Sequence, residues 1–364
     1  MIVKDVTTIL EELAPLHYAE DFDNVGLLVG DANATVTGIL VTLDTLENVI
    51  DEAIAKKYNL VVSFHPIIFG GLKKLTGATY VERVVLKAIR NNIAIYSMHT
   101  ALDNARDGVN AKICEILGVN QTEVLIPKKQ LIRKLTTYVP VAEAEKLKKH
   151  LFSAGAGTIG DYSECSFTVE GEGSYKAGPK ATPTKGNLGE THYESEAQIN
   201  CTYPKAKESA ILKALFTQHP YEEVAYEISS LENSNQHLGM GRVGNLTQPM
   251  NEKAFLQFLK DKMNASVVRH SKLLGKPIKR VAVLGGSGAF AIGAAKKANA
   301  DVFVSADIKY HQFYEAEDKM VIADIGHYET EQFTKNLLVD YLTKKIPNFA
   351  VALSQSITNP IKYF

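Results

Sequence analysis

Short apolar runs alternate with amphipathic stretches over the first 124 residues. The runs are rich in Val, Ile and Leu and are short enough to be buried strands, at 38–43, 59–63 and 93–98. The stretches around them have the apolar spacing of helices, at 4–14, 46–56, 81–91 and 108–117. This alternation of strand and helix predicts a parallel sheet with helices on both faces.

The same rhythm returns near residue 250. Predicted strands lie at 279–284, 301–305, 320–325 and 349–353, and predicted helices at 251–263, 289–298 and 332–343. The stretch G-M-G-R-V-G at 239–244 precedes them and is typical of a flexible connection. The two outer segments are therefore both predicted to be α/β, and they form either one sheet system or two similar halves.

The middle of the chain follows another pattern. A strand at 134–141 and a helix at 142–154 precede a region rich in Gly, Ser and Thr, which includes a polar loop at 171–191. A strand at 196–203, a helix at 205–218 and a strand at 221–229 complete it. With a further strand in the Gly-, Ser- and Thr-rich region, the order is β-α-β-β-α-β, which is that of a small ferredoxin-like α+β unit. We therefore predict an inserted α+β domain at 125–235 within an α/β domain made of 1–124 and 236–364.

The composition is that of a globular protein without a dominant charge. The chain has 364 residues, of which 45% are hydrophobic and 22% charged, and its net charge is −1. Balanced charge disfavours a nucleic-acid or membrane-surface binder, which needs a basic face. Three widely separated cysteines, Cys114, Cys165 and Cys201, indicate neither a disulfide framework nor a thiolate zinc site. We expect a cytoplasmic protein with no membrane segment.

Histidines and acidic residues follow three of the predicted strands. His65 comes after 59–63, His99 and Asp103 after 93–98, and His327 and Glu331 after 320–325. In open α/β sheets, ligands bind beyond the carboxyl ends of the strands. If a helix begins at His327, Glu331 lies one turn further along the same face. Imidazole and carboxylate ligands suit a divalent ion such as Zn, Mn or Fe, so the sequence predicts a metal site.

Each of these residues also has an ordinary structural interpretation. His65 precedes a proline and fits a turn, His99 fits a hydrogen bond to a neighbouring loop, and Asp103 fits a helix cap. His327 and Glu331 fit a solvated helix start. The metal site is favoured because three equivalent strand ends carry such residues, and not because any one of them is decisive.

Two further features follow predicted strands. Asp307, Lys309 and His311 come after 301–305, where Asp307 can cap a helix and the other two fit a solvated face. The sequence G-G-S-G at 285–288 opens a helix, and its backbone N–H groups could hold a phosphate. It lacks the dinucleotide G-x-G-x-x-G pattern and the P-loop G-K-[ST], so a tight turn is the better-supported role.

Eight motifs, in order, carry a family resemblance. They are D-N-V-G-L-L-V-G, S-F-H-P-I-I-F, M-H-T-A-L-D, H-P-Y-E-E, G-M-G-R-V-G, G-G-S-G, S-A-D-I-K-Y-H and G-H-Y-E-T-E. Over nearly the whole chain the sequence resembles the NIF-three-like dinuclear-metal proteins, often named GTP cyclohydrolase I type 2 homologues. The resemblance implies two α/β halves around a metal site and an inserted small domain of the PII or CutA kind. It also implies a homohexamer built as a trimer of dimers.

The resemblance further implies roles for individual residues. It puts the metal ligands at His65, Asp103, His327 and Glu331, with Glu331 bridging two divalent ions, and it puts His99 beside the metals or against the substrate. The family pattern has a second histidine directly before the one at His65, where this chain has Phe64. Phenylalanine cannot ligate a metal. We therefore expect one or two ions per chain, with the second site weakened.

The sequence leaves two main functions open. The first is a metal-dependent hydrolase that acts on a nucleotide, as the family name implies, or on a phosphate ester, with a metal-activated water and with His99 moving protons. The second is a non-catalytic binding or scaffold hexamer whose metal is structural or regulatory and whose inserted domain gates a cavity. A small-molecule ligand fits both. A third hypothesis, DNA binding inside a ring, is disfavoured by the balanced charge.

Overall fold

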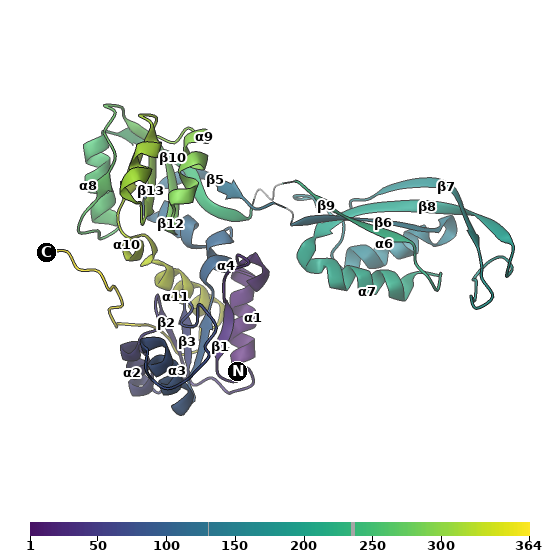
Figure 1. The fold of residues 1–364 in the computed structure, drawn as a ribbon, viewed down its shortest axis with the longest axis horizontal. Helices are drawn as coiled ribbons and strands as arrows, with labels where there is room; N and C mark the ends of the chain where they lie inside the picture. The colour runs from purple at the N-terminus through teal and green to yellow at the C-terminus, as the bar shows by residue number, and fades with distance from the viewer. Residues whose placement is uncertain (130, 234–236) are drawn as a thin grey trace. The chain divides into compact units, whose positions relative to one another are not determined.

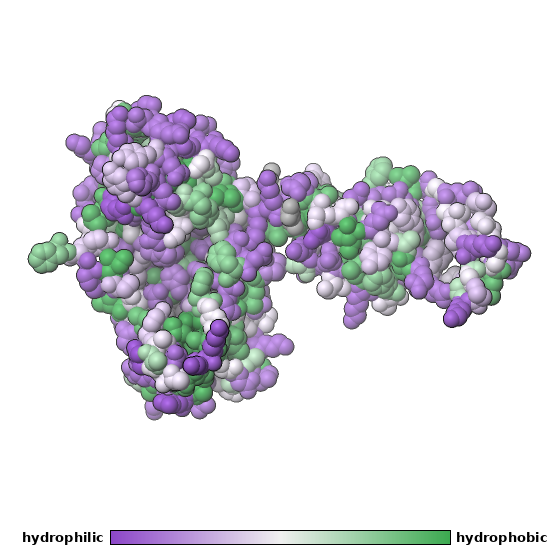
Figure 2. Space-filling view, viewed as in Figure 1, coloured by the Kyte–Doolittle hydropathy of each residue, from purple (hydrophilic) through white to green (hydrophobic). Residues whose placement is uncertain are grey.

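The computed structural model describes residues 1–129, 131–233 and 237–364 (Figure 1). The chain divides into two compact units: unit 1 is Met1–Pro127 with Gln236–Phe364, and unit 2 is Lys128–Asn235. Unit 1 is a mixed α/β body with two sheets, and unit 2 contains a third. Figure 2 shows hydrophilic residues over much of the visible face of each unit. Among the described helices, none has both the length and the apolar character that crossing a membrane requires.

The first sheet of unit 1 has the strand order β1-β4-β3-β2-β15. Its strands are β1 (Gly26–Val29), β2 (Ile39–Thr42), β3 (Leu60–Ser63), β4 (Ala94–Ser97) and β15 (Val351–Leu353). The last four in the order run parallel, as the sequence predicted, whereas β1 pairs antiparallel with β4 at the edge. The apolar residues of β1 carry no information about the direction of this edge strand.

Helices cover both faces of this sheet because successive side chains in a strand point to opposite sides. The helices of the first third are α1 (Val3–Leu13), α2 (Glu47–Lys56), α3 (Tyr80–Arg90), α4 (His99–Asn104) and α5 (Val109–Ile116). One face packs on α1, through Ile39, Val41, Leu60 and Val62. The other face packs on α2 and α3, through Leu40, Val61 and Ile95.

The second sheet of unit 1 has the order β11-β14-β13-β12-β10-β5. Its strands are β5 (Val119–Pro127), β10 (Gly239–Met250), β11 (Arg269–His270), β12 (Ile278–Ser287), β13 (Val302–Ala306) and β14 (Val321–Asp324). The central three run parallel and the others antiparallel to their neighbours. The helices of the last third are α8 (Glu252–Lys262), α9 (Ile292–Lys297), α10 (His327–Glu331) and α11 (Thr334–Lys345).

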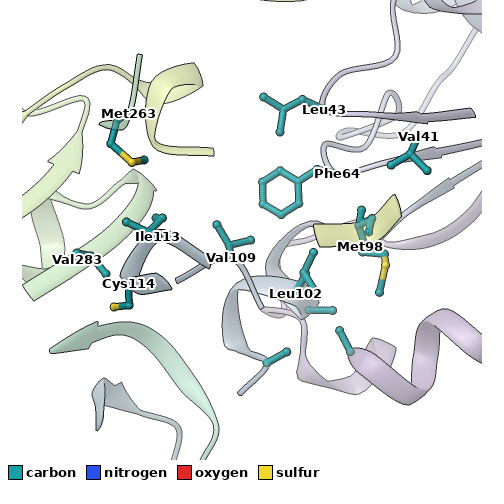
Figure 3. Close-up of a cluster of buried hydrophobic side chains, with 14 of the residues drawn as sticks. Val41, Leu43, Phe64, Met98, Leu102, Val109, Ile113, Cys114, Met263 and Val283 are labelled. Atoms are coloured by element: carbon teal, nitrogen blue, oxygen red, sulfur yellow. The ribbon is translucent and has the colours of Figure 1, made fainter. Parts of the chain in front are cut away.

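The two outer segments exchange elements. β5 from the first segment completes the second sheet, and β15 from the last segment completes the first sheet. A single apolar cluster joins them, from Val41, Leu43 and Phe64 on one side to Ile113 and Val283 on the other (Figure 3). The outer segments are therefore two sheets with a shared core, and this core holds the ends of β3 and β14 in fixed positions.

The prediction of a flexible connection at 239–244 is wrong. This stretch begins β10, which pairs with β5 on one side and with β12 on the other. A Cβ at Gly241, where φ is +69°, would lie 2.9 Å from the carbonyl oxygen of Val283. The glycine therefore permits a close approach of neighbouring backbones inside a sheet, and does not provide flexibility.

Unit 2 has one antiparallel sheet with the order β7-β8-β6-β9. Its elements are β6 (Ile132–Pro140), α6 (Ala144–Ser153), β7 (Phe167–Lys176), β8 (Thr191–Pro204), α7 (Glu208–Gln218) and β9 (Tyr226–Leu231). Short 3-10 helices occur in both units, at Leu16–Tyr18, Val141–Glu143, Lys205–Lys207, Ala289–Ala291 and Tyr310–Ala316. The predicted polar loop at 171–191 is wrong at both ends. Residues 171–176 belong to β7, whose side chains are mostly exposed and so lack the apolar alternation of a half-buried strand.

Candidate metal centre

Three side chains of unit 1 meet at one point. His65 follows β3 of the first sheet, whereas His327 and Glu331 lie at the two ends of α10, which follows β14 of the second sheet. Their ligand atoms all lie within 4.8 Å of one another. Oε2 of Glu331 is 3.1 Å from Nε2 of His65 and 3.2 Å from Nε2 of His327. The carboxyl ends of β3 and β14, which belong to different sheets, thus bring two histidines to the carboxylate of Glu331.

Carboxylates orient both histidines. Nδ1 of His65 lies 2.7 Å from Oδ1 of Asp44, which follows β2, and Nδ1 of His327 lies 2.7 Å from Oδ2 of Asp307, which follows β13. An ionised carboxylate only accepts hydrogen bonds, so each Nδ1 carries the proton. Each Nε2 faces Glu331 and would offer its lone pair to a bound ion. This is the carboxylate–histidine arrangement that commonly supports a metal ion.

The three groups depend on one another for their charge. Burial lowers the pKa of His65, but Asp44 and Glu331 outweigh it and raise that pKa to about 10. Burial likewise lowers the pKa of His327, while Glu331 and Asp307 raise it to about 9. Burial raises the pKa of Glu331, but the two histidines lower it to about 2. The site therefore combines two imidazoles with three carboxylates, those of Glu331, Asp44 and Asp307, and either protons or a divalent cation can compensate this negative charge.

Two buried carboxylate oxygens have no hydrogen-bond partner among the described residues: Oε2 of Glu331 and Oδ1 of Asp103. The two Nε2 atoms lie within ion-pair distance of Oε2, but not in hydrogen-bond geometry. Leaving a buried carboxylate oxygen without a partner is costly. Ligands bound to zinc at 2.0–2.2 Å lie about 3.0–3.5 Å from one another, which matches the Nε2–Oε2 separations. The residues present therefore fit a divalent ion.

Asp103 and His99 come from α4, beside the cluster. Burial and the charge of Glu331 raise the pKa of Asp103 well above its ordinary value. The side chain is not part of the three-residue cluster, and its role as a ligand stays a prediction. The His99 ring is 5.3 Å from the His65 ring, and its Nδ1 is 2.8 Å from Oδ1 of Asp23. Burial raises the pKa of Asp23, but His99 and Thr100 outweigh it and lower that pKa.

Comparisons with known proteins identify the family of the chain. A family model described as Duf34/NIF3 (NGG1p interacting factor 3) matches residues 1–360. The chain belongs to this family. The resemblance predicted from the eight motifs is thereby confirmed.

Relatives of this Duf34/NIF3 member align from end to end. A Bacillus subtilis protein named GTP cyclohydrolase 1 type 2 homolog is 37% identical, over 99% of this chain and 98% of its own. A crystal structure titled as a Bacillus cereus protein related to NIF3 is 34% identical, with a TM-score of 0.82 over 100% of this chain and 99% of that one. A Staphylococcus aureus structure is 29% identical, with a TM-score of 0.81 and the same coverage.

Phe64 is fully buried in this Duf34/NIF3 chain. Its side chain lies in the apolar cluster with Leu43 and Val109 (Figure 3). Its ring lies 4.9 Å from the His65 ring and meets the His99 ring edge-on at 5.5 Å. The position expected to hold a second histidine therefore adjoins the candidate metal ligands, but its side chain is an apolar ring that cannot ligate.

The glycine-rich motif at 285–288 supports the candidate metal centre indirectly. The N–H groups of Gly285 and Gly286 donate to Asn110 Oδ1 and Thr330 Oγ1, which leaves them unavailable to a phosphate. A Cβ on Gly286, where φ is +70°, would collide with Oε1 of Glu331. The motif thus lets α10 pack closely on β12 and brings Glu331 to the histidines.

The fourth strand end contributes one residue to the centre. Asp307 accepts a hydrogen bond from Ser287 and orients His327, so its expected capping role is replaced by a role in the site. Lys309 and His311 are exposed, in agreement with a solvated face. Sequence reasoning missed Asp44 and Asp23. Asp44 directly follows a predicted strand, so the strand-end rule could have found it, whereas Asp23 lies in a loop that only the fold brings to His99.

Proposed function

We propose that this protein is a metal-dependent hydrolase acting on a nucleotide or a phosphate ester. The observation that carries the proposal is the cluster of His65, His327 and Glu331, whose ligand atoms lie within 4.8 Å of one another. Beside it, buried carboxylate oxygens of Glu331 and Asp103 have no hydrogen-bond partner among the described residues. Imidazole and carboxylate ligands of this kind suit Zn, Mn or Fe. The name of the Bacillus subtilis relative makes GTP the first substrate to test.

His65, His327, Glu331 and Asp103 are the proposed ligands. A bound divalent ion would supply the acidity that brings the pKa of a water molecule near neutrality. Asp44 and Asp307 hold the two histidines in the tautomer that leaves Nε2 unprotonated for the ion. Glu331 carries the negative charge needed at the centre, since its pKa lies at about 2.

His99 is the proposed proton carrier. Asp23 accepts the Nδ1 proton of its ring, so the lone pair of Nε2 can take a proton from water or return one to a leaving group. The centroid of the His99 ring lies 5.3 Å from that of His65, which is one of the proposed ligands. Phe64 removes a ligand from the second position, so we propose one firmly held ion and one weakly held ion per chain.

The test is turnover by the reconstituted protein. Loaded with Zn, Mn or Fe, it should hydrolyse GTP or a chromogenic phosphate ester, and His327→Ala should lower kcat/KM by at least about 100-fold. His270→Ala is the matched control, because this histidine on β11 is exposed and its ring bonds to the carbonyl oxygen of Ser271, away from the cluster of His65, His327 and Glu331. The absence of turnover with every metal, or an unchanged rate in His327→Ala, would favour the non-catalytic scaffold instead.

We also propose a cytoplasmic homohexamer, a trimer of dimers, in which unit 2 is the ferredoxin-like insertion. The support is the family membership and the β-α-β-β-α-β element order of unit 2. Light scattering should give about six times the chain mass of 39.9 kDa. A monomer mass at micromolar concentration would refute the assembly.

A further inference from the structure

Two large aromatic side chains are exposed beside His99. Phe22 is 67% exposed and Phe69 is 55% exposed. Their ring centroids lie 6.4 Å apart, with the ring planes at 51°. Isolated exposed apolar residues are ordinary, but two adjacent phenylalanine rings form a contiguous apolar surface of the kind that marks binding sites. We refer to Phe22 and Phe69 together as the aromatic pair.

The loops that carry the aromatic pair are held by polar contacts next to each ring. Asp23, directly after Phe22, accepts hydrogen bonds from His99 and from the backbone and hydroxyl of Thr100. Asn24 donates through Nδ2 to the carbonyl oxygen of Ile68, directly before Phe69. The two loops are thus bonded to each other and to the start of α4. The exposed rings therefore lie on loops whose positions are fixed by hydrogen bonds.

The aromatic pair begins a series of rings that ends in the metal centre. The ring of Phe69 is 6.2 Å from that of His99, His99 is 5.3 Å from His65, and His65 is 5.5 Å from His327. A planar group stacked on Phe69 would therefore lie next to the proposed proton carrier. The groups attached to that planar ring would reach the proposed metal ligands.

We propose that Phe22 and Phe69 bind the planar aromatic ring of the substrate, a purine base being the simplest case. This inference rests on the proposed function for the position of the reacting bond, but the ring binding itself is independent of it. Two faces that each contact a third ring at about 3.5 Å are about 7 Å apart. The observed centroid separation of 6.4 Å is close to this distance, and holding a ring between the two faces requires the 51° angle between the ring planes to become smaller.

The chain has room for that movement. Gly70 and Gly71 directly follow Phe69, and a Cβ at either position would contact nothing within 4 Å. The segment after Phe69 can therefore shift without displacing packed side chains. Base stacking on one aromatic ring changes affinity by roughly 5- to 100-fold, which sets the scale of the expected effect.

The experiment uses the absence of tryptophan from the sequence. Phe69→Trp and Phe22→Trp each introduce a single indole at the aromatic pair, and Phe167→Trp introduces one at a 69% exposed position in unit 2. Chelator-treated protein is titrated with GMP and, separately, with ribose 5-phosphate, which lacks the base. GMP should quench the first two variants saturably but not the third, and ribose 5-phosphate should quench none. Adding Phe22→Ala to Phe69→Trp should raise the Kd for GMP at least about 5-fold.

Three outcomes would overturn the inference. They are no saturable quenching in either variant at the aromatic pair, equal quenching in Phe167→Trp, and indole emission that follows protein concentration instead of GMP. The last would mean that a second copy of the chain covers the rings. Because metal is absent from the titration, quenching does not depend on turnover. Quenching by GMP in chelator-treated protein, together with no hydrolase activity in the reconstituted protein, would refute only the proposed function. Hydrolysis by the reconstituted protein without quenching would refute only the role of the aromatic pair.

Discussion

Phe64 and His65 are neighbours in sequence with opposite surroundings. Phe64 points into the apolar core, whereas His65 points to Glu331 at the edge of that core. His65, His327 and Glu331 could be predicted because each follows a buried strand, and strand ends are visible in the sequence. Asp44 also follows a predicted strand and could have been found in the same way, whereas Asp23 was missed because its role depends on which loops become neighbours in space. Residue types thus indicated the ligands, but not the carboxylates that orient them.

Phe64→His should add a ligand to the centre. We expect calorimetric titration with zinc to give a stoichiometry closer to two ions per chain than in the unmodified protein. A buried imidazole without metal should lower the free energy of unfolding by roughly 1–3 kcal/mol, and zinc should restore it. Phe255→His is the matched control, because Phe255 is equally buried but lies on α8. An unchanged stoichiometry in Phe64→His would show that Phe64 does not occupy a ligand position.

The stability of chelator-treated protein should fall as pH rises above neutrality. The pKa values of His65 and His327 are raised from 6.5 to about 10 and about 9. Their contribution to stability is therefore complete below about pH 6.5 and is lost as pH rises through 9 and 10. Glu331 acts in the opposite sense, because its pKa is lowered from 4.5 to about 2. Its contribution is present above about pH 4.5 and is lost toward pH 2.

This prediction is measured as Tm against pH at constant ionic strength. The Tm should decline between pH 6.5 and 10, and the decline should be much smaller in the double variant His65→Gln, His327→Gln. A Tm that is constant or rises over this interval in chelator-treated protein would contradict the charge arrangement described here.

At the scale of elements, the segment after β15 connects α2 to the metal centre. Ser354, Gln355 and Ser356 all donate to the carboxylate of Glu52 on α2. The hydroxyl of Thr358 then donates to Oδ2 of Asp44 at 2.7 Å. The end of the chain thereby stabilises the carboxylate that orients His65.

Thr358→Val should weaken metal binding without unfolding the protein. Replacing a group that orients a ligand typically costs 10- to 100-fold in metal affinity. Asp44→Asn should fall in that range, and Thr358→Val, one contact further from the ion, should lose roughly 2- to 10-fold. Competition with a chromophoric chelator measures both. Thr217→Val is the control, since its hydroxyl donates to the carbonyl oxygen of Lys213 within α7, in unit 2. Equal metal affinities in Thr358→Val and Thr217→Val would show that the segment after β15 does not support metal binding.

Most helices and buried strands were predictable because their apolar spacing is strong. The strands that were not predicted share one cause: they are held by backbone pairing, and their side chains lack the apolar alternation that indicates a strand. β7 is exposed along most of its length, and β10 begins with glycines that fit a sheet interior. β5 was not predicted as a strand at all, since its residues are mostly polar until Val124. These strands are defined by their partners and not by their own composition.

At the scale of the whole molecule, unit 2 is inserted into a strand-to-strand connection of unit 1. Pro127 at the end of β5 is paired with Gly239 at the start of β10. The two points where the chain leaves and re-enters unit 1 are therefore neighbours, as at the two ends of a hairpin.

Replacing residues 128–238 with a short turn should consequently leave unit 1 folded, with its metal stoichiometry unchanged. Circular dichroism and metal analysis test this prediction. A shortened chain that folds but binds no metal would mean that unit 2 contributes to the centre.

The central claim is that His65, His327 and Glu331 hold a divalent ion. The most direct measurement is elemental analysis of the reconstituted protein, of Glu331→Gln and of Glu329→Gln. Glu329 is the matched control, because it is also buried on α10 but accepts a hydrogen bond from Asn359 instead of facing the histidines. We predict about one ion per chain in the unmodified protein and in Glu329→Gln, and less than about one tenth of an ion in Glu331→Gln. No ion in the reconstituted protein, or equal content in the two variants, would contradict the account.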